Sequence, residues 1–431
     1  HHTICNLEAA FASMRRRPYC PAAMRQSGTG YRAFPRNIRL LIVSRFARSV
    51  GQGVTVASFA LYLHALGFGG TVIGAVLTAG LVFGATLTAI VGPLSDRRSR
   101  RAMLLIYEVV SGLAALAVMV ISSDVVLFAA ATIAGFGRGA NGAAGPFAPV
   151  EQAWIAREVE GATRRQALSF NATVGFLGMA AGATLALHPG VLSGDITVNG
   201  YRLLFAVPAL SSLAAVAALA LTQETQAPPA PPTLHPLSGD HITRQENRQL
   251  RRLAIANVVN GFGIGMIGPL MAYWFALRYG KGLSSIGPAM AVGFVLAAFG
   301  SLLSGRLATR FGPVRAVLLM RGFGILCLAA MPFAPAFGVA VALYAVRSAF
   351  NRGTVGARQA VTADLTRAER RGMAASIQNL SLQIPRAIGP LLGGWLLHRG
   401  DLALPFLIAA GLQAAYVVLY GIFFGSLDRM R

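Results

Sequence analysis

Charged side chains are scarce in this chain of 431 residues. Only 12% of them are Asp, Glu, Lys or Arg, against roughly 25% in soluble domains. Acidic residues are the fewest, fifteen against 38 basic ones, and lysine occurs once, as Lys281. Hydrophobic residues make up 55% and the mean hydropathy is +0.59. This balance excludes an ordinary soluble domain and indicates a membrane protein.

Sequence signals for metal, disulfide or enzyme chemistry are also lacking. The three cysteines, Cys5, Cys20 and Cys327, have neither metal-ligand spacing nor the number that a disulfide framework needs. The patterns HExxH, GxSxG and GxxxxGK[ST] do not occur. We therefore expect no metal, no cofactor and no enzymatic activity.

The formal charge of +23 raises the question of a nucleic-acid partner. A soluble nucleic-acid-binding protein gathers its arginines on a polar face, whereas here they separate apolar segments. The expected partner of this surface is the lipid bilayer, with no nucleic acid.

Apolar segments long enough to cross a bilayer recur along the chain with short polar breaks. Before them, residues 1–37 are basic and lack the continuous apolar core of a signal peptide, so we expect a cytoplasmic tail. The twelve predicted spans are 38–66, 71–91, 102–122, 125–148, 166–188, 202–222, 252–279, 284–304, 316–335, 337–357, 372–397 and 402–424.

A polar, proline-rich stretch, "TQETQAPPAPPTLHPLSGDHITRQENRQLRR", separates the sixth span from the seventh. It is too hydrophilic to span a membrane and is predicted to be a cytoplasmic linker. The expected domains are an N-terminal bundle at 38–222, a linker at 223–251, a C-terminal bundle at 252–424 and a tail at 425–431.

Orientation follows from the arginines, because every even-numbered span ends in a basic loop. Examples are Arg157 after the fourth span and Arg315 after the eighth, whereas the opposite breaks carry only scattered charges such as Asp124. By the positive-inside rule both termini are predicted to be cytoplasmic, in a multi-pass protein of a bacterial inner membrane.

The two halves resemble each other in sequence. "GPLSDRRSRRAMLL" (92–105) matches "GRLATRFGPVRAVLL" (305–319), and each lies between the second and third spans of its half. A second match joins "QAWIAREVEGATRRQALS" (152–169) to "QAVTADLTRAERRGMAAS" (359–376) without a gap, at a spacing of 207 residues.

On these features the chain resembles the major facilitator superfamily, whose loop signature after the second span is G-x-L-x-D-R-x-G-R-R. The resemblance covers nearly all of the chain past residue 38. It implies an all-α transmembrane fold of twelve helices in two pseudo-symmetric six-helix bundles. Ser99 and Thr309 depart from the signature, replacing a glycine in the first copy and the aspartate in the second. The matching residues of the first copy are Gly92, Leu94, Asp96, Arg97, Arg100 and Arg101.

A charged cluster at a tight turn can join the halves in one state and release them in the other, as alternating access requires. We expect this gating role for Asp96 and its neighbours, and the alternative is that the arginines only set topology. The predicted gating residues are Gly92, Asp96, Arg97, Arg100, Arg101, Gly305 and Arg310.

Ionisable residues inside spans are costly in hydrocarbon and are therefore functional candidates. Arg138, in "GFGRGANGAAG", resembles with Asn141 the R-x-x-Q-G motif of proton-coupled exporters of the superfamily. Its guanidinium group can bind an anion through two hydrogen bonds. The alternative is a structural arginine bonded to carbonyl groups at a helix end.

Further substrate-binding candidates come from other spans. Arg347 and Asn351 lie in the tenth span, the counterpart of the fourth, and Arg45 and Arg48 share one face of the first. Those two can also extend to lipid headgroups. Two amides early in the seventh span, Asn257 and Asn260, complete the set.

Proton coupling needs a group whose charge changes as access alternates. Glu108 lies clearly within a span, in "LLIYEVVSG", and Glu151 lies near the mouth of the fourth. His64, towards the outer end of the first span, is a further candidate and an ordinary interfacial hydrogen bonder as the alternative. Glu108 is equally a possible structural partner of Arg45 or Arg138.

The excess of intramembrane arginine over acid predicts an anionic small-molecule substrate. The sequence thus indicates a monomeric secondary transporter, most simply an exporter driven by protons. The open alternatives are a multidrug exporter of lipophilic compounds, an importer or facilitator of a small metabolite, and a receptor that binds without transport.

Overall fold

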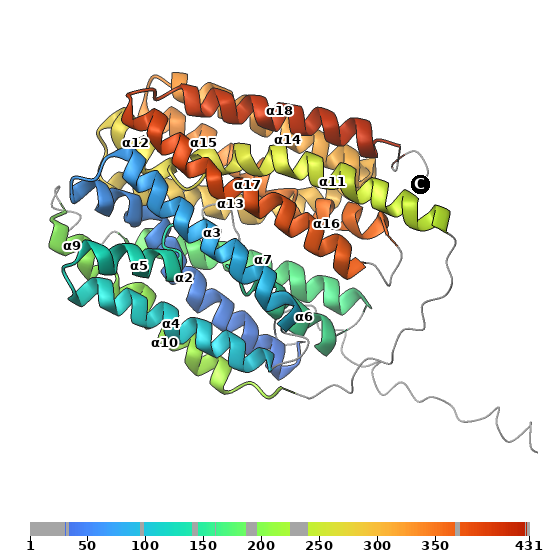
Figure 1. Ribbon diagram of the computed structural model, residues 1–431, viewed down its shortest axis with the longest axis horizontal. Helices are drawn as coiled ribbons and strands as arrows, with labels where there is room; N and C mark the ends of the chain where they lie inside the picture. The colour runs from blue at the N-terminus through green and yellow to red at the C-terminus, as the bar shows by residue number, and fades with distance from the viewer. Residues whose placement is uncertain are drawn as a thin grey trace, which may run out of the picture.

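The computed structural model describes residues 31, 34–94, 99–139, 145–159, 161–186, 196–224, 240–366, 371–426 and 428. Every regular element within these ranges is a helix, and the helices run roughly side by side (Figure 1). They group into the twelve expected crossings, six in each half, so the predicted fold class is confirmed.

The N-terminal half supplies the first six crossings. The fourth is formed by two helices, α5 and α6, and the sixth by α9 and α10. The bounds are α2 Arg36–Ala65, α3 Gly70–Leu94, α4 Arg100–Val120, α5 Asp124–Ala134, α6 Ala148–Glu158, α7 Gly161–Leu185, α9 Val198–Leu203 and α10 Ala206–Ala220.

The C-terminal half repeats this order, with its seventh and tenth crossings each divided in two. The bounds are α11 Asp240–Ile267, α12 Met271–Tyr279, α13 Leu283–Phe311, α14 Pro313–Ala330, the short 3₁₀ helix η2 Met331–Phe333, α15 Phe337–Gly353, α16 Val355–Asp364, α17 Arg371–His398 and α18 Leu404–Phe424. The helix α11 begins inside the stretch expected to be a linker, because no proline follows Pro236 until Pro269.

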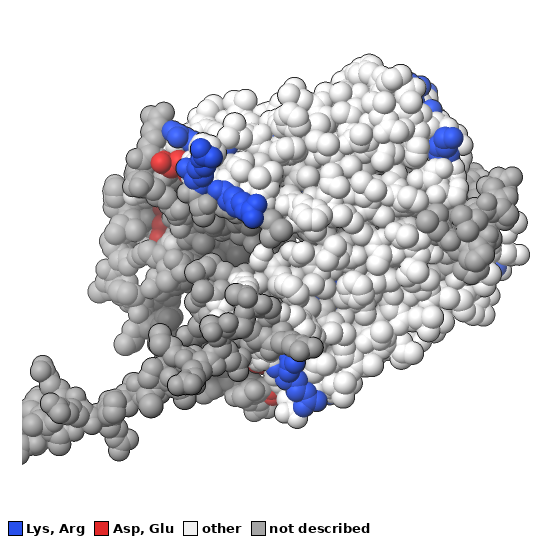
Figure 2. All heavy atoms as spheres, turned by 180° about the vertical axis from the view of Figure 1, so that it is seen from behind, with Lys and Arg blue, Asp and Glu red and all other residues white. Residues whose placement is uncertain are grey.

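Length and composition make seven of the described helices able to cross a membrane, and the bent pair of α11 and α12 would be an eighth. Figure 2 shows charged atoms towards the two ends of the visible face, with a broad uncharged surface between them. This belt fits the hydrocarbon core of a bilayer. We call the end at which α4 and α14 begin, with Arg100 and Arg315, the basic end.

Glycines allow the helices of each half to approach closely. The backbone of α2 meets α7, where Gly53 touches Met179 and Gly182 touches Val50. The equivalent approach in the C-terminal half puts Gly265 of α11 against α17. Small residues are the usual means of helix packing in membranes, since they bring backbones into van der Waals contact.

Glycine and proline also explain where crossings are interrupted. Helix α5 ends at Ala134 because Gly135 adopts a left-handed conformation, with φ of 68°, and Gly137 and Gly139 also have positive φ. Helices α11 and α12 meet at an angle of 44° around Gly268 and Pro269. By contrast, α17 stays continuous through Pro385 and Pro390.

A carboxylate following the last helix of each half caps the third helix of that half. Glu224 accepts hydrogen bonds from Ser99 Oγ at 2.5 Å and from the backbone N–H of Arg100 at 2.9 Å. Asp428 accepts them from the backbone of Val314 and Arg315 at 3.2 and 2.7 Å. These caps are related by the repeat and satisfy otherwise unpaired N–H groups of α4 and α14.

Partial burial acts to raise the pKa of Glu224, but the hydrogen bonds from Ser99, Arg100 and Arg101 outweigh it and hold this pKa below its ordinary value. Glu224 is therefore ionised at neutral pH, which suits the positive end of the α4 dipole.

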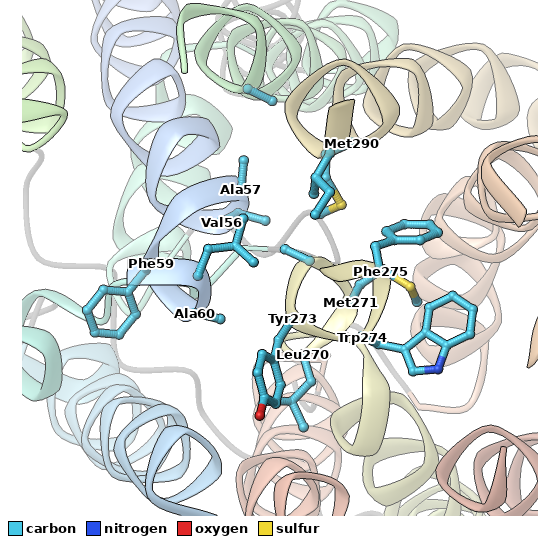
Figure 3. Packing of buried hydrophobic residues seen from close by; sticks show 14 of the residues in the cluster. Val56, Ala57, Phe59, Ala60, Leu270, Met271, Tyr273, Trp274, Phe275 and Met290 are labelled. Carbon is cyan, nitrogen blue, oxygen red and sulfur yellow. The ribbon is translucent and has the colours of Figure 1, made fainter. Parts of the chain in front are cut away.

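The hydrophobic core has a different organisation at the two ends. Away from the basic end, residues of both halves form one cluster, in which Val56 and Ala60 of α2 lie towards Met271 and Tyr273 of α12, whereas Phe59 points to the other side of α2 (Figure 3). At the basic end the described buried residues form two separate clusters, one within 34–219 and one within 253–424. The halves are thus joined by apolar packing at one end only.

The α2–α7 contact predicts that a methyl group at Gly182 destabilises the protein, because it would meet the Val50 carbonyl. We expect Gly182→Ala to lower the free energy of unfolding by about 1–3 kcal/mol, seen as a lower melting temperature in detergent. Gly322→Ala is the matched control, since nothing lies within 4 Å of its added carbon. Equal melting temperatures of the two variants would contradict this packing.

Candidate functional site

The strongest polar contact inside the N-terminal half is made by Arg48 of α2. Its Nη1 lies 3.2 Å from Glu108 Oε1 on α4, and its Nη2 forms an ion pair with Glu151 of α6. The three side chains are at most 5% exposed. One guanidinium group thus joins three helices. In this cluster a predicted substrate residue, Arg48, meets two predicted proton carriers, Glu108 and Glu151.

Two further groups complete the cluster. Asn171 of α7 donates a hydrogen bond from Nδ2 to Glu151 Oε1 at 2.5 Å. Arg45 lies against Gly175 and is close enough for its charge to interact with both glutamates. Positions i and i+3 place Arg45 and Arg48 on one face of α2. Two buried cations and two buried anions therefore compensate each other.

The two glutamates are not equivalent. Glu151 is held by Arg48 and Asn171, whereas Glu108 has Arg48 as its hydrogen-bond partner and its Oε2 has none in the structure. A cavity of about 40 Å³ lies beside Glu108, which is enough for one water molecule. It is lined by Arg48, Gly51, Gln52, Thr55, Tyr107, Glu108, Ser111, Ala134, Gly135, Phe136, Pro208 and Ser212.

Arg138 lies just past the end of α5, in the glycine turn rather than in the middle of a helix as its span predicts. Only 8% of it is exposed, yet none of its three guanidinium nitrogens has a hydrogen-bond partner among the residues that the structure describes. The group lies against Gly84 and Gly135, and Gly135 also lines the cavity of Glu108. Asn141 lies outside the described residues.

Arg386 of α17 is the C-terminal group whose charge interacts with that of Arg138. It is 4% exposed, donates to Gln383 Oε1 at 3.3 Å, and leaves its Nε and Nη2 without partners. The neighbouring charge of Arg352 acts on it as well. The charges of Arg138 and Arg386, one from each half, thus act on one another, and neither side chain forms an ion pair with a described carboxylate.

The predicted substrate residues of the C-terminal half lie on two helices, α11 and α15. Arg347 is 4% exposed and its Nε has no partner, while Asn351 donates to Gln413 at 3.1 Å. Asn257 donates to Ser381 at 3.2 Å, and Asn260 accepts from Arg321 at 3.0 Å. These amides are held in contacts between helices.

His64 does not join the glutamate cluster. Its side chain is exposed at the end of α2 away from the basic end, and its ring packs against Tyr273 at 5.2 Å. This contact links α2 to α12 across the two halves.

The predicted gating residues lie at the basic end. Gly92 lies in the last turn of α3. Gly305 and Arg310 belong to α13, where Arg310 stacks over Phe311 at 5.2 Å. Arg101 donates to the Leu219 and Ala220 carbonyls, so it ties α4 to α10 within one half. Asp96 and Arg97 lie outside the described residues.

Four buried arginines lie outside the predicted site residues: Arg321 of α14, Arg352 of α15, Arg358 of α16 and Arg386 of α17. Arg321 lies deep in the ninth span, so its charge was a usable signal. Arg358 lies in a basic loop sequence, where topology alone accounts for an arginine. In the part of the chain that is described, no group of three or more His, Cys, Asp or Glu is arranged to hold a metal ion.

The described geometry can be compared with known proteins. The family model described as Major Facilitator Superfamily matches residues 41–251 and 253–429. No curated protein matches the chain in sequence.

Several solved structures share the fold. A bacterial homologue of the human lysosomal transporter Spinster, in an inward-facing and unoccupied conformation, is 16% identical, with a TM-score of 0.63, covering 93% of this chain and 98% of its own. The nucleoside transporter NupG is 14% identical, with a TM-score of 0.65 and coverage of 91% and 99%. A D-xylose-proton symporter is 14% identical, with a TM-score of 0.66 and coverage of 89% and 96%.

Removing Arg48 is expected to destabilise the protein strongly, because two buried carboxylates lose their shared cation. We expect Arg48→Gln to lower the free energy of unfolding by about 3–5 kcal/mol, measured by thermal or denaturant unfolding in detergent. Adding Glu108→Gln and Glu151→Gln to it should recover part of that loss. A single variant as stable as the wild type would show that the cluster contributes nothing.

Proposed function

Because the chain belongs to the major facilitator superfamily, a family of membrane transporters, we propose that it carries a small organic anion together with protons across the bacterial inner membrane. Transport proceeds by alternating access between the two halves. The observation that carries the proposal is Arg138, which is buried, has no hydrogen-bond partner for its three guanidinium nitrogens among the described residues, and acts electrostatically on Arg386 of the other half.

An anionic substrate follows from the cost of that arrangement. An uncompensated buried cation is expensive, and a guanidinium group pairs best with a carboxylate or phosphate through two parallel hydrogen bonds. Arg386, on the other half, offers two more free donors. A bound anion that touches both groups would be stabilised by both halves at once. A lipophilic cation would be repelled at this place, which argues against the multidrug alternative.

Glu108 is the proposed proton carrier. A proton on its unpartnered Oε2 leaves Arg48 paired with Glu151, so the cluster keeps one complete ion pair in either state. Glu151, held by both Arg48 and Asn171, is better suited to remain ionised. The adjacent cavity provides a place for water to deliver the proton.

The proximity of Glu108 to the Arg138 region bears on the direction of coupling. Gly135 lines the cavity of Glu108 and also lies against Arg138. A proton on Glu108 removes a negative charge from the neighbourhood, which strengthens anion binding at Arg138. Proton and anion then move in the same direction, and export results when the anion is more concentrated inside the cell. The sequence resemblance of Arg138 to exporter motifs supports proton exchange as the second candidate.

The separate cores at the basic end support a state in which access is open on that side. By the positive-inside rule this side is the cytoplasm. The predicted gating cluster around Asp96 would then form its contact between the halves when the basic end closes. Both termini would be cytoplasmic.

Loss of the Arg138 guanidinium should weaken substrate binding. We expect Arg138→Gln to reduce affinity for the transported anion about 10- to 100-fold, as for a lost charged hydrogen bond. The measurement is uptake into proteoliposomes of lactate, succinate and glycerol 3-phosphate, with glucose and tetraphenylphosphonium as neutral and cationic probes.

Arg251→Gln is the matched control, because Arg251 of α11 is exposed and lies outside the predicted substrate, proton and gating residues. If Arg138→Gln takes up the transported anion as well as the wild type does, the main support for an anion carrier is lost. Uptake of the cation alone would favour a multidrug transporter.

Replacing Glu108 should separate proton movement from substrate exchange. We expect Glu108→Gln to abolish anion accumulation driven by a pH gradient, while exchange of internal for external anion continues. The readouts are a pH-sensitive dye inside the vesicles and labelled anion. If an inward proton gradient drives wild-type uptake, the two move together, and if it drives efflux they exchange. Unchanged gradient-driven transport in Glu108→Gln would exclude Glu108 as the carrier.

A further inference from the structure

The two halves carry opposite charges at positions related by the internal repeat. Glu151 directly precedes the first copy of the ungapped match and Arg358 directly precedes the second. In the match of RAMLL with RAVLL, Arg321 takes the place of Tyr107, directly beside Glu108. Where the N-terminal half has two buried acids, the C-terminal half therefore has a buried arginine at one of the two positions and a second one residue away from the other.

The residue at the position of Arg48, which pairs with both glutamates in the N-terminal half, also differs in the C-terminal half. Gly53 and Gly265 make equivalent contacts, with Met179 on α7 and Arg386 on α17. Counted back from these glycines, the place of Arg48 is taken by Asn260. Where the N-terminal copy has one arginine between two glutamates, the C-terminal copy thus has one neutral amide and two arginines, which form no ion pair with a carboxylate in the part of the chain that is described.

Arg321 is held in position by neighbouring groups. Its Nη1 donates to Asn260 Oδ1 at 3.0 Å and its Nε to Thr354 Oγ1 at 3.2 Å. The guanidinium carbon lies 5.3 Å from the centre of the Tyr416 ring. These contacts orient the group but supply no negative charge.

Other buried donor groups near Arg321 have no hydrogen-bond partner among the described residues. Arg358 is 7% exposed, and its Nε and Nη1 have no hydrogen-bond partner in the structure. The buried hydroxyl groups of Tyr416 and Tyr420 have none either, and their rings pack 5.3 Å apart. Arg321 lies over the Tyr416 ring, which packs against Tyr420, and the charge of Arg358 acts on both Arg321 and Tyr420.

The surroundings are apolar. Val314, Val317 and Val361 belong to the buried cluster that encloses both tyrosines at the basic end. Among the described residues, neither Arg321 nor Arg358 forms an ion pair with a carboxylate. Two like charges in such a place repel strongly. Guanidinium N–H and tyrosine O–H groups are donors that would together suit an anion.

We propose that the C-terminal half binds a small inorganic anion, such as chloride, between Arg321, Arg358, Tyr416 and Tyr420. The ion takes the place that acids hold in the N-terminal copy and neutralises one of the two arginines. The site belongs to one half, so the proposal does not depend on the identity or coupling of the transported substrate.

The test is the melting temperature of the purified full chain in detergent, at constant ionic strength, as chloride replaces gluconate. Gluconate is too bulky for a site within a packed cluster. We expect chloride to raise the melting temperature by about 2 °C or more, with saturation, and bromide to act similarly. A melting temperature that is the same in chloride and gluconate would overturn the proposal.

Variants locate the ion. Arg358→Gln should abolish the chloride response and should be at least as stable as the wild type in gluconate, because the repulsion is removed. Tyr420→Phe keeps the shape and should shift half-saturation to higher chloride, which covers the case in which Arg358→Gln does not fold. Arg138→Gln is the control and should retain the full response. A response lost in Arg138→Gln but kept in Arg358→Gln would move the ion to the other half and refute the site.

Discussion

The N-terminal half depends on one guanidinium group. Arg48 binds Glu108 of α4 and Glu151 of α6, which lie far apart in the sequence, and Asn171 extends the contact to α7. Within a bilayer no hydrophobic force favours one helix over lipid, so packing and polar bonds of this kind set the arrangement. The same contact holds Glu108, the proposed proton carrier, beside a cavity the size of a water molecule. The ion pairs that stabilise this half therefore include the residue proposed to carry the proton.

Much of the fold was predictable from the sequence because hydrocarbon restricts the possible structures. Length and apolarity predict the twelve crossings, and the repeated loop sequences predict the two halves. The break between α11 and α12 coincides with a glycine–proline pair, Gly268 and Pro269, but proline alone is not decisive, because α17 continues through Pro385 and Pro390. The break after Ala134 was not predicted, although Gly135, Gly137 and Gly139 form a spaced glycine signal in that span. Arg138 was placed in a helix for this reason, and it lies in a turn.

The site was only partly predictable. Helical spacing places Arg45 and Arg48 on one face, but their meeting with Glu108 and Glu151 depends on how α2, α4 and α6 pack, which spacing alone does not determine. The arginines expected to bind substrate and the glutamates expected to carry protons thus form one cluster. Arg358 could not be separated from arginines that only set topology, because its burial results from the tertiary structure.

The carboxylate caps of Glu224 and Asp428 show which features the two copies of the repeat share. Both copies tie the end of their last helix to the start of their third, although their buried charges have opposite signs. A duplicated gene whose copies kept the contacts needed to fold and changed their interiors would leave this pattern. In such a history the caps are the contacts that both copies kept from one six-helix unit. The buried residues that differ, acids in one copy and arginines in the other, are where the two copies later diverged.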